Sequence, residues 1–207
     1  MTAALQRLLP ELRACKACEP ALPLGARPIF QLDRRASILI ASQAPGRVAH
    51  DKGRPFDDAS GDRLRQWLDV SRETFYDPAC FAILPMGMCF PGSGPSGDLP
   101  PRPECAPLWR QRLLAALPRV RLTLAIGQYA LAWHLQRKAS VDELVAGWRE
   151  QLARGLLPLP HPSPRNQRWL RDRPWFEAEV LPALREAVAI ALGAAGGARS
   201  RTHGRTP

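Results

Sequence analysis

No stretch of the 207-residue chain reaches the roughly 18 uninterrupted apolar residues that a membrane-spanning helix requires. The amino-terminal segment also lacks a long apolar run followed by a small-residue cleavage site, which a secretory signal would show. The Walker-type pattern, GxxxxGK followed by Ser or Thr, does not occur either. We therefore expect a cytoplasmic protein without membrane contact, and a nucleotide hydrolase or phosphotransferase is the weakest of the functions weighed below.

Lysine is scarce, because only Lys16, Lys52 and Lys138 contribute to the 29 basic residues, and the others are all arginine. Basic residues outnumber the 19 acidic ones and give a formal net charge of +10. Such a charge favours nucleic acid or another polyanion as partner. The arginine bias is equally consistent with the base composition of a genome, so charge alone leaves both explanations open. The length suits one domain, and we expect a monomer.

Five cysteines in a reducing compartment favour metal binding or catalysis over structural disulfides. Cys15 and Cys18 form a C-x-x-C pair, and fifteen residues separate Cys89 from Cys105. Four thiolates can hold a 4Fe-4S cluster or a tetrahedral zinc ion, and four unrelated buried thiols are the third interpretation. The remaining cysteine, Cys80, is predicted to be a core thiol.

Short apolar runs alternate with segments of helical periodicity along the chain. Strands are predicted over 36–42, 81–84, 122–126 and 156–159, and helices over 5–13, 62–70, 108–117, 129–136 and 175–192. This alternation predicts an α/β fold, a single-domain three-layer α/β/α arrangement with a mostly parallel central sheet. The domain is expected over 1–192, followed by a disordered basic tail over 193–207 that contains Arg199, Arg201 and Arg205.

Ligands of such sheets bind beyond the carboxyl ends of the strands, so the loops over 43–56, 85–97, 127–129 and 161–168 are the expected site. The first contains Ser-Gln-Ala-Pro-Gly over 42–46, then Gly-Arg-Pro-Phe over 53–56, Ser-Gly over 60–61 and Leu64. The last contains His-Pro-Ser-Pro over 161–164. In this order, each after a predicted strand, these segments resemble the uracil-DNA glycosylase superfamily, particularly its iron-sulfur branch, often called family 4. The resemblance extends from about Cys15 to about Leu184.

The resemblance implies roles in breaking the bond between a base and its sugar. His161 corresponds to the donor that stabilises negative charge on the pyrimidine O2, although a lone histidine more often caps a loop. Phe56 corresponds to the aromatic ring that stacks on the base once it has left the duplex, with a core aromatic as the alternative. Gln43 and the amides around Ala44 would contact the base or position water.

The same resemblance implies a DNA contact and a cofactor. The segment after His161 corresponds to a minor-groove wedge, made here by Ser163, Pro164, Arg165 and Asn166. An ordinary proline-rich turn is the alternative. The cysteine spacing is similar to that of the iron-sulfur branch, so the resemblance implies a 4Fe-4S cluster on Cys15, Cys18, Cys89 and Cys105, with zinc the less favoured metal.

Two departures from the family pattern bear on chemistry. Pro85 stands where the branch has an asparagine that reads the uracil edge, and proline offers no side-chain or backbone donor. Gln43 stands where the branch has a glutamate, and a neutral amide cannot act as a general base. His50 and Asp51 are the nearest titratable candidates for activating water.

The sequence therefore predicts a DNA glycosylase that hydrolyses the N-glycosidic bond of uracil or another deaminated base in base excision repair. The alternative is a non-catalytic DNA- or RNA-binding relative that keeps the fold and the iron-sulfur cluster. The two departures at Pro85 and Gln43 are what support this alternative.

Overall fold

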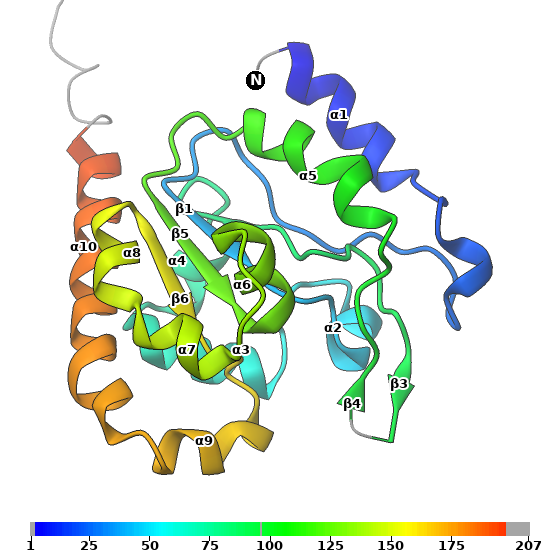
Figure 1. Ribbon diagram of the computed structural model, residues 1–207. Helices are drawn as coiled ribbons and strands as arrows, with labels where there is room; N and C mark the ends of the chain where they lie inside the picture. The colour runs from blue at the N-terminus through cyan, green and yellow to red at the C-terminus, as the bar shows by residue number, and fades with distance from the viewer. Residues whose placement is uncertain (1–2, 96, 198–207) are drawn as a thin grey trace, which may run out of the picture.

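The computed structural model describes residues 3–95 and 97–197, shown as a ribbon in Figure 1. In chain order its longer helices and its strands are α1 (Ala3–Arg13), β1 (Ile38–Ala41), α2 (Arg47–Lys52), α3 (Ala59–Leu68), α4 (Arg72–Tyr76), β2 (Phe81–Ile83), β3 (Ser93–Gly94), β4 (Gly97–Asp98), α5 (Cys105–Ala115), β5 (Leu122–Ile126), α6 (Gly127–Leu135), α7 (Val141–Ala146), α8 (Trp148–Ala153), β6 (Leu156–Leu159), α9 (Gln167–Arg171) and α10 (Leu181–Gly197). Single turns occupy Glu19–Ala21, Pro164–Asn166 and Phe176–Val180.

The central sheet has four strands in the order β2-β1-β5-β6, and all three pairings are parallel. Ile38 of β1 lies opposite Phe81 of β2 on one side and Leu122 of β5 on the other. Side chains of the strands are almost all buried, as expected for a parallel sheet that is covered on both faces. The predicted α/β fold with a parallel central sheet is confirmed.

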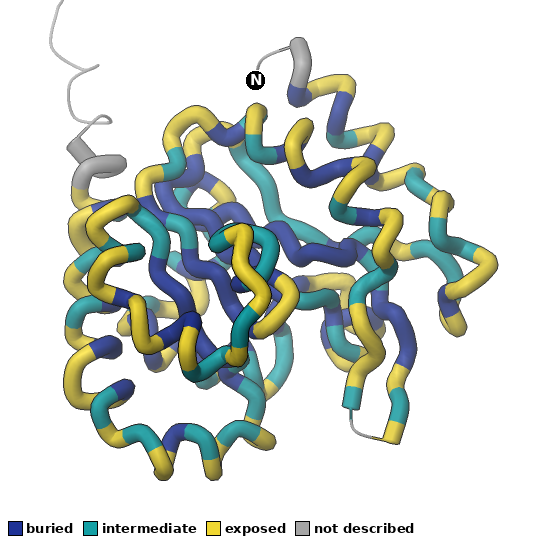
Figure 2. The backbone as a smooth tube through the Cα atoms, in the orientation of Figure 1, coloured by how far each residue is buried: buried dark blue, intermediate teal, exposed yellow. Residues whose placement is uncertain are grey.

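Helices cover the sheet on both faces, and alternate residues of β1 show which helices lie where. Ile38 and Ile40 belong to a hydrophobic cluster with residues of α3 and α10, including Trp67. Leu39 belongs to a second cluster with residues of α1 and α5, including Trp109. Figure 2 shows the buried strands between these exposed helical layers. Helices therefore pack on both faces of β1, as in a three-layer fold.

The nine predicted elements occur close to their predicted places, but several short ones were not predicted. The helices α2, α4, α7 and α8 have only five or six residues, too few to show a helical period. Helix α10 continues to Gly197, five residues past the predicted end of the domain at residue 192. The rest of the predicted tail, 198–207, lies outside the described residues.

The parallel strands bring the elements that follow them to one end of the molecule. In Figure 1 the arrows of β5 and β6 point to the lower end, where α2, α9 and the hairpin of β3 and β4 lie. Within the described part of the chain, no helix is both long and apolar enough to cross a membrane.

Candidate active site

A pocket of about 410 Å³ opens at the carboxyl end of the sheet, as expected for a parallel α/β fold. Three of the four predicted loops contribute to it, together with the β3–β4 hairpin. Its lining consists of Ser42, Gln43, Ala44, Pro45, Gly46, Ala49, Pro55, Phe56, Asp58, Ser60, Pro85, Gly97, Asp98, His161, Ser163, Arg165 and Asn166. Segments up to 124 residues apart in the sequence thus meet at one cavity.

The loop after β1 is held by backbone bonds to the loop after β2. The amide of Met86 donates to the carbonyl of Ser42 at 2.7 Å, and that of Gly87 donates to the carbonyl of Gln43 at 2.9 Å. The side-chain Nε2 of Gln43 donates to the carbonyl of Leu99 at 3.0 Å. The donor end of this amide is therefore engaged within the protein, and its carbonyl oxygen is the end available to accept a hydrogen bond.

Phe56 is buried in the pocket wall with a left-handed backbone, φ +55°. This conformation is costly for a non-glycine residue and persists only where the surroundings hold it. Its carbonyl accepts bonds from the Tyr76 hydroxyl at 3.0 Å and the Arg65 guanidinium at 3.3 Å. A Cβ on Gly61 would overlap that carbonyl, so the turn requires glycine there. The structure thus holds the Phe56 ring in the pocket wall, and its stacking on a base stays a prediction.

His161 follows β6 and lies in the same wall. The planes of its ring and the Phe56 ring are 27° apart, with centroids separated by 6.5 Å. Burial lowers the pKa of His161, while the carboxylates of Asp58 and Asp98 act in the opposite direction. The net lowering from a usual value near 6.5 leaves the imidazole mostly neutral at pH 7, with one N–H to donate.

The predicted wedge is a single 3₁₀ turn that is tied to its surroundings. The Ser163 hydroxyl accepts from the Arg165 amide at 3.2 Å, and the Ser163 carbonyl accepts from Arg63 of α3 at 3.1 Å. Asn166 donates its side-chain N–H to the carbonyl of His161 at 2.7 Å, which fixes the His161 backbone. Pro164 is exposed at the start of the turn. Insertion into a DNA groove stays a prediction.

Arg165 lines the pocket together with the loop after β1. A Cβ on Gly97 would overlap its guanidinium, so the side chain reaches the β3–β4 hairpin. The hairpin was not predicted from the sequence, because each strand has only two residues. Contact between the hairpin and Arg165 closes one side of the pocket.

His50 and Asp51 are not among the residues that line the pocket, and their predicted role in activating water stays a prediction. Both lie in α2, which begins after Gly46. The buried His50 ring packs 5.8 Å from the Phe90 ring. Asp51 is exposed and pairs with Arg47, one helical turn earlier, at 3.0 Å.

Two carboxylates that were not predicted line the pocket instead. Asp58 and Asp98 approach Gly46, whose Cβ, if present, would lie 3.9 Å and 3.0 Å from their Oδ2 atoms. Asp58 caps α3 by accepting the Gly61 amide at 2.9 Å, and the Ser93 hydroxyl donates to Asp98 at 2.9 Å. Asp58 directly precedes α3, where an aspartate is a capping signal, but the helix predicted from the sequence began only at residue 62. Asp98 had no local sequence signal, because only the hairpin brings it to the pocket.

The four predicted thiols line a second, smaller pocket between α1, the loop after β2 and α5. The indole N–H of Trp109 donates to Cys15 Sγ at 3.3 Å, and the Met88 amide donates to Cys105 Sγ at 3.4 Å. Burial raises the pKa of Cys89 to about 12 and that of Cys105 to about 11. Within 3–95 and 97–197, no three His, Cys, Asp or Glu side chains are grouped closely enough to hold a metal ion. Cys80 lies apart from these thiols, half-buried against the main hydrophobic cluster.

A scan against known protein families adds an independent observation. Residues 29–185 match the family described as the Uracil DNA glycosylase superfamily. The matched segment includes the loops that carry Gln43, Phe56 and His161, as well as all four strands of the sheet.

Proposed function

We propose that this chain, which belongs to the uracil DNA glycosylase superfamily, removes uracil or another deaminated base from DNA. The observation that carries the proposal is the pocket at the carboxyl end of the sheet, where Phe56 and His161 lie in one wall. A base must leave the duplex before its bond to the sugar is accessible, and this pocket can receive it. The product would be an abasic site.

The reaction is a hydrolysis. The bond between C1′ of the sugar and the base nitrogen breaks, its electron pair leaves with the base, and the oxygen of a water molecule bonds to C1′. Phe56 would stack on the base, and the neutral His161 would donate its N–H to a base oxygen as negative charge develops. Such a donor is typically worth about 10²–10³ in rate in a dry pocket.

Water activation falls to the carboxylates that line the pocket. An ionised Asp58 or Asp98 can accept the proton that water loses, whereas the amide of Gln43 cannot. Their negative charges would also favour the positive charge that develops on the sugar. This assignment replaces His50 and Asp51, which lie outside the pocket lining.

The test is excision from labelled duplexes that contain uracil, hypoxanthine or xanthine, followed by alkaline cleavage at the abasic site. We expect strand cleavage with at least one of the three bases and none with an undamaged duplex. Absence of cleavage with every base, at protein concentrations that bind the duplex, would contradict the proposal.

We also propose that the thiols of Cys15, Cys18, Cys89 and Cys105 hold a 4Fe-4S cluster. The four thiols line one small pocket, and N–H donors point at Cys15 and Cys105, which supports this although among the described residues no three of them are grouped closely enough to hold a metal ion. The cluster would cross-link α1 to the loop after β2 and to α5.

Protein prepared under low oxygen should be brown and contain iron, and Cys80→Ser should retain the same iron content. Protein that contains stoichiometric zinc instead of iron would show a zinc site in place of the proposed cluster. Protein that contains neither metal would contradict both kinds of site.

A second candidate function is DNA or RNA binding without catalysis. Pro85 favours it, because this residue lines the pocket at the place of the family's base-reading asparagine and offers no donor. Intact affinity for duplex DNA without excision of any tested base would select this second function.

A further inference from the structure

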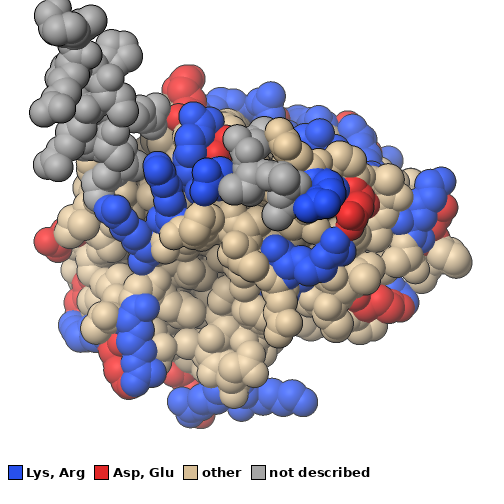
Figure 3. All heavy atoms as spheres, turned by 90° about the horizontal axis from the view of Figure 1, so that it is seen from above, with Lys and Arg blue, Asp and Glu red and all other residues tan. Residues whose placement is uncertain are grey.

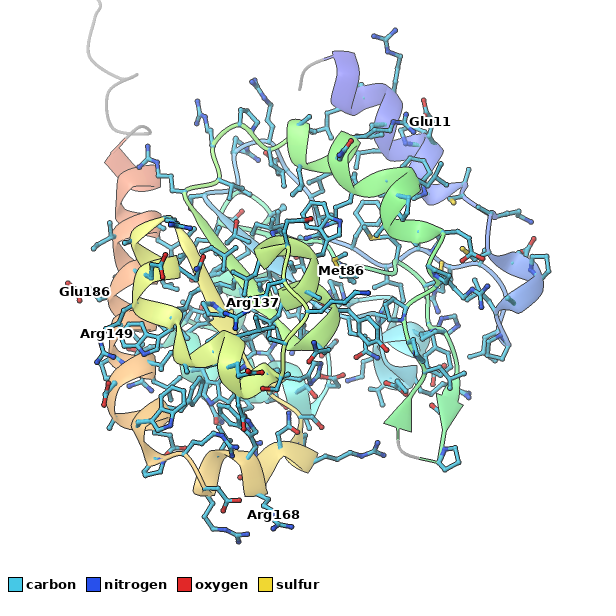
Figure 4. The ribbon with its side chains drawn as sticks, in the orientation of Figure 1. Glu11, Met86, Arg137, Arg149, Arg168 and Glu186 are labelled. Atoms are coloured by element: carbon cyan, nitrogen blue, oxygen red, sulfur yellow. The ribbon has the colours of Figure 1, made fainter. Side chains whose placement is uncertain are left out.

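The buried guanidinium of Arg110 lies directly behind the pocket wall that Pro85 forms. Arg110 is only 2% exposed, and its Nη1 donates to the carbonyl of Leu84 at 2.7 Å and to that of Pro85 at 3.4 Å. Pro85 lines the pocket, whereas Arg110 does not. Met86, the next residue of this segment, is labelled in the interior in Figure 4. One residue therefore separates a buried cation from the cavity.

The charge of Arg110 has no carboxylate partner among the described residues. Its Nη2 lies 2.6 Å from Nε2 of His134, and the guanidinium carbon lies 5.2 Å from the centre of the Trp133 ring. Its Nε has no hydrogen-bond partner. The pKa of His134 is lowered to about 3 by burial and then by Arg110, so His134 accepts as a neutral ring. The positive charge is thus shielded from solvent and has no carboxylate partner, while the charge of Cys105 acts against the lowering of the Arg110 pKa by burial.

Burying an unpaired charge costs several kcal/mol, and a neutral donor could satisfy the same carbonyls at lower cost. A cation at this place therefore has value where an anion lies or forms nearby, either the Cys105 thiolate of the proposed cluster or an anion in the pocket. The proposed reaction forms one, because the bond electrons leave with the base inside the pocket. In a low-dielectric interior, a fixed charge interacts strongly with another charge even without direct contact.

We propose that Arg110 is a positioning residue that holds positive charge behind Pro85 and so stabilises the departing base as its negative charge develops. The inference rests on the proposed glycosylase function and deepens it. It also gives the Pro85 wall a role in catalysis, although proline itself donates no hydrogen bond.

The test compares excision of uracil and 5-fluorouracil from the same duplex in single turnovers. Fluorine withdraws electrons and makes the departing base a better leaving group, so it needs less help from Arg110. We expect Arg110→Gln, which keeps donors but loses the charge, to slow uracil excision about 10- to 100-fold. The slowing of 5-fluorouracil excision should be several-fold smaller, and Arg110→Lys should recover part of the loss.

Arg65 supplies a matched control. It is also buried and donates to the carbonyl of a pocket residue, Phe56, but its charge is paired with Asp62 at 2.5 Å. Arg65→Gln should therefore change the two excision rates by the same factor. The matched comparison separates loss of an unpaired charge from loss of a hydrogen bond to the wall.

Equal slowing of both bases by Arg110→Gln, in a variant that unfolds at the wild-type denaturant concentration, overturns the inference and leaves the proposed function intact. Loss of iron with equal slowing also overturns it, because Arg110 would then serve the thiol site. If the wild-type protein excises neither uracil nor 5-fluorouracil, the inference about Arg110 is wrong. Excision from the hypoxanthine or xanthine duplex would then still support the proposed function, and its absence would contradict that function as well.

Discussion

Phe56 combines an unfavourable backbone conformation with a fixed place in the pocket. The left-handed φ of this residue is held from three sides, by Tyr76, by Arg65 and by the close approach of Gly61. Backbone strain of this kind costs about 1–3 kcal/mol and is found where a functional side chain must point in one direction. The cost is offset by the buried contacts of the Phe56 ring, whose centroid lies 6.3 Å from the centroid of the Phe75 ring.

Gly61→Ala should displace Phe56. The new methyl group would overlap the Phe56 carbonyl, so the turn must open or α3 must shift. We expect a loss of about 1–3 kcal/mol in the free energy of unfolding, the usual cost of overpacking, together with slower excision. Chemical denaturation measures the first effect and single-turnover assays the second. A variant with wild-type stability and rate would show that Phe56 does not need this backbone conformation.

His161→Ala should separate binding from chemistry. The N–H of His161 is predicted to act only as charge develops on the base, so excision should slow about 10²–10³-fold with DNA affinity nearly unchanged. Single-turnover rates and equilibrium binding to the same duplex check this. Unchanged excision would remove His161 from the charge-stabilising role and leave the fold assignment intact.

Helix α3 positions one side of the pocket through its first turn. Asp58 caps the helix, and Arg63 and Arg65 extend from it to the loop after His161 and to Phe56. On its other side the helix packs against α10, and its Trp67 ring lies 5.1 Å from the ring of Phe176 in the turn that precedes α10. One helix therefore couples the hydrophobic layer to the geometry of the site.

Asp58→Asn tests the carboxylate without removing the cap, because asparagine caps helices about as well as aspartate. We expect the free energy of unfolding to change by less than about 1 kcal/mol, and excision to slow about 10²–10⁴-fold if Asp58 activates water. Asp98→Asn is the matched variant on the hairpin. Wild-type rates in both variants would exclude these carboxylates as the general base.

The turn over 163–166 leads to a prediction about DNA binding. Each phosphate that a basic side chain neutralises contributes about −0.9 to the slope of log affinity against log salt concentration. Arg165→Ala should reduce the magnitude of this slope by about one if Arg165 leaves the hairpin to contact phosphate. Arg121→Ala, at the amino end of β5, is the control and should leave the slope unchanged. Equal slopes for Arg165→Ala and wild type would assign Arg165 to the hairpin alone.

Positive charge is spread over the whole molecule. Figure 3, which views it from above Figure 1, shows many Lys and Arg residues on the end opposite the pocket. Exposed arginines lie within three residues of the start of three strands, at this end, namely Arg35 before β1, Arg121 before β5 and Arg154 before β6. At the pocket end, Arg168 on α9 projects outward in Figure 4. Net charge indicates a polyanionic partner but does not locate its site.

The buried pair of Arg110 and His134 makes stability depend on pH. His134 has a pKa of about 3 in the folded protein, and an unfolded chain binds a proton near pH 6.5. Between these values the unfolded state binds more protons, so stability rises with pH and falls on acidification. We expect a loss of about 1 kcal/mol per pH unit from pH 6 to pH 4 that is absent in His134→Gln. Denaturation midpoints at pH 7, 5 and 4 check this, and equal losses in both proteins would contradict it.

The sequence by itself determined the architecture and the principal site loops. The apolar runs of β1, β5 and β6 are local signals, because burial on both faces requires each strand to be apolar along its length. Alternation with helices requires parallel strands, and parallel strands place the following loops at one end. Gln43, Phe56 and His161 therefore had to lie near one another once the fold was known.

Only the tertiary structure decided which charged groups face the pocket. Asp98 reaches it on a hairpin too short to show a pattern, and His50 is not part of its lining although it lies only seven residues from Gln43. Arg110 came to lie behind Pro85 through the packing of α5 against the sheet, 25 residues further along the chain. Local composition predicts which segments are buried, but the contact between two distant side chains depends on how the layers pack. For this reason the sequence located the pocket, and the structure identified its carboxylates and the cation behind its wall.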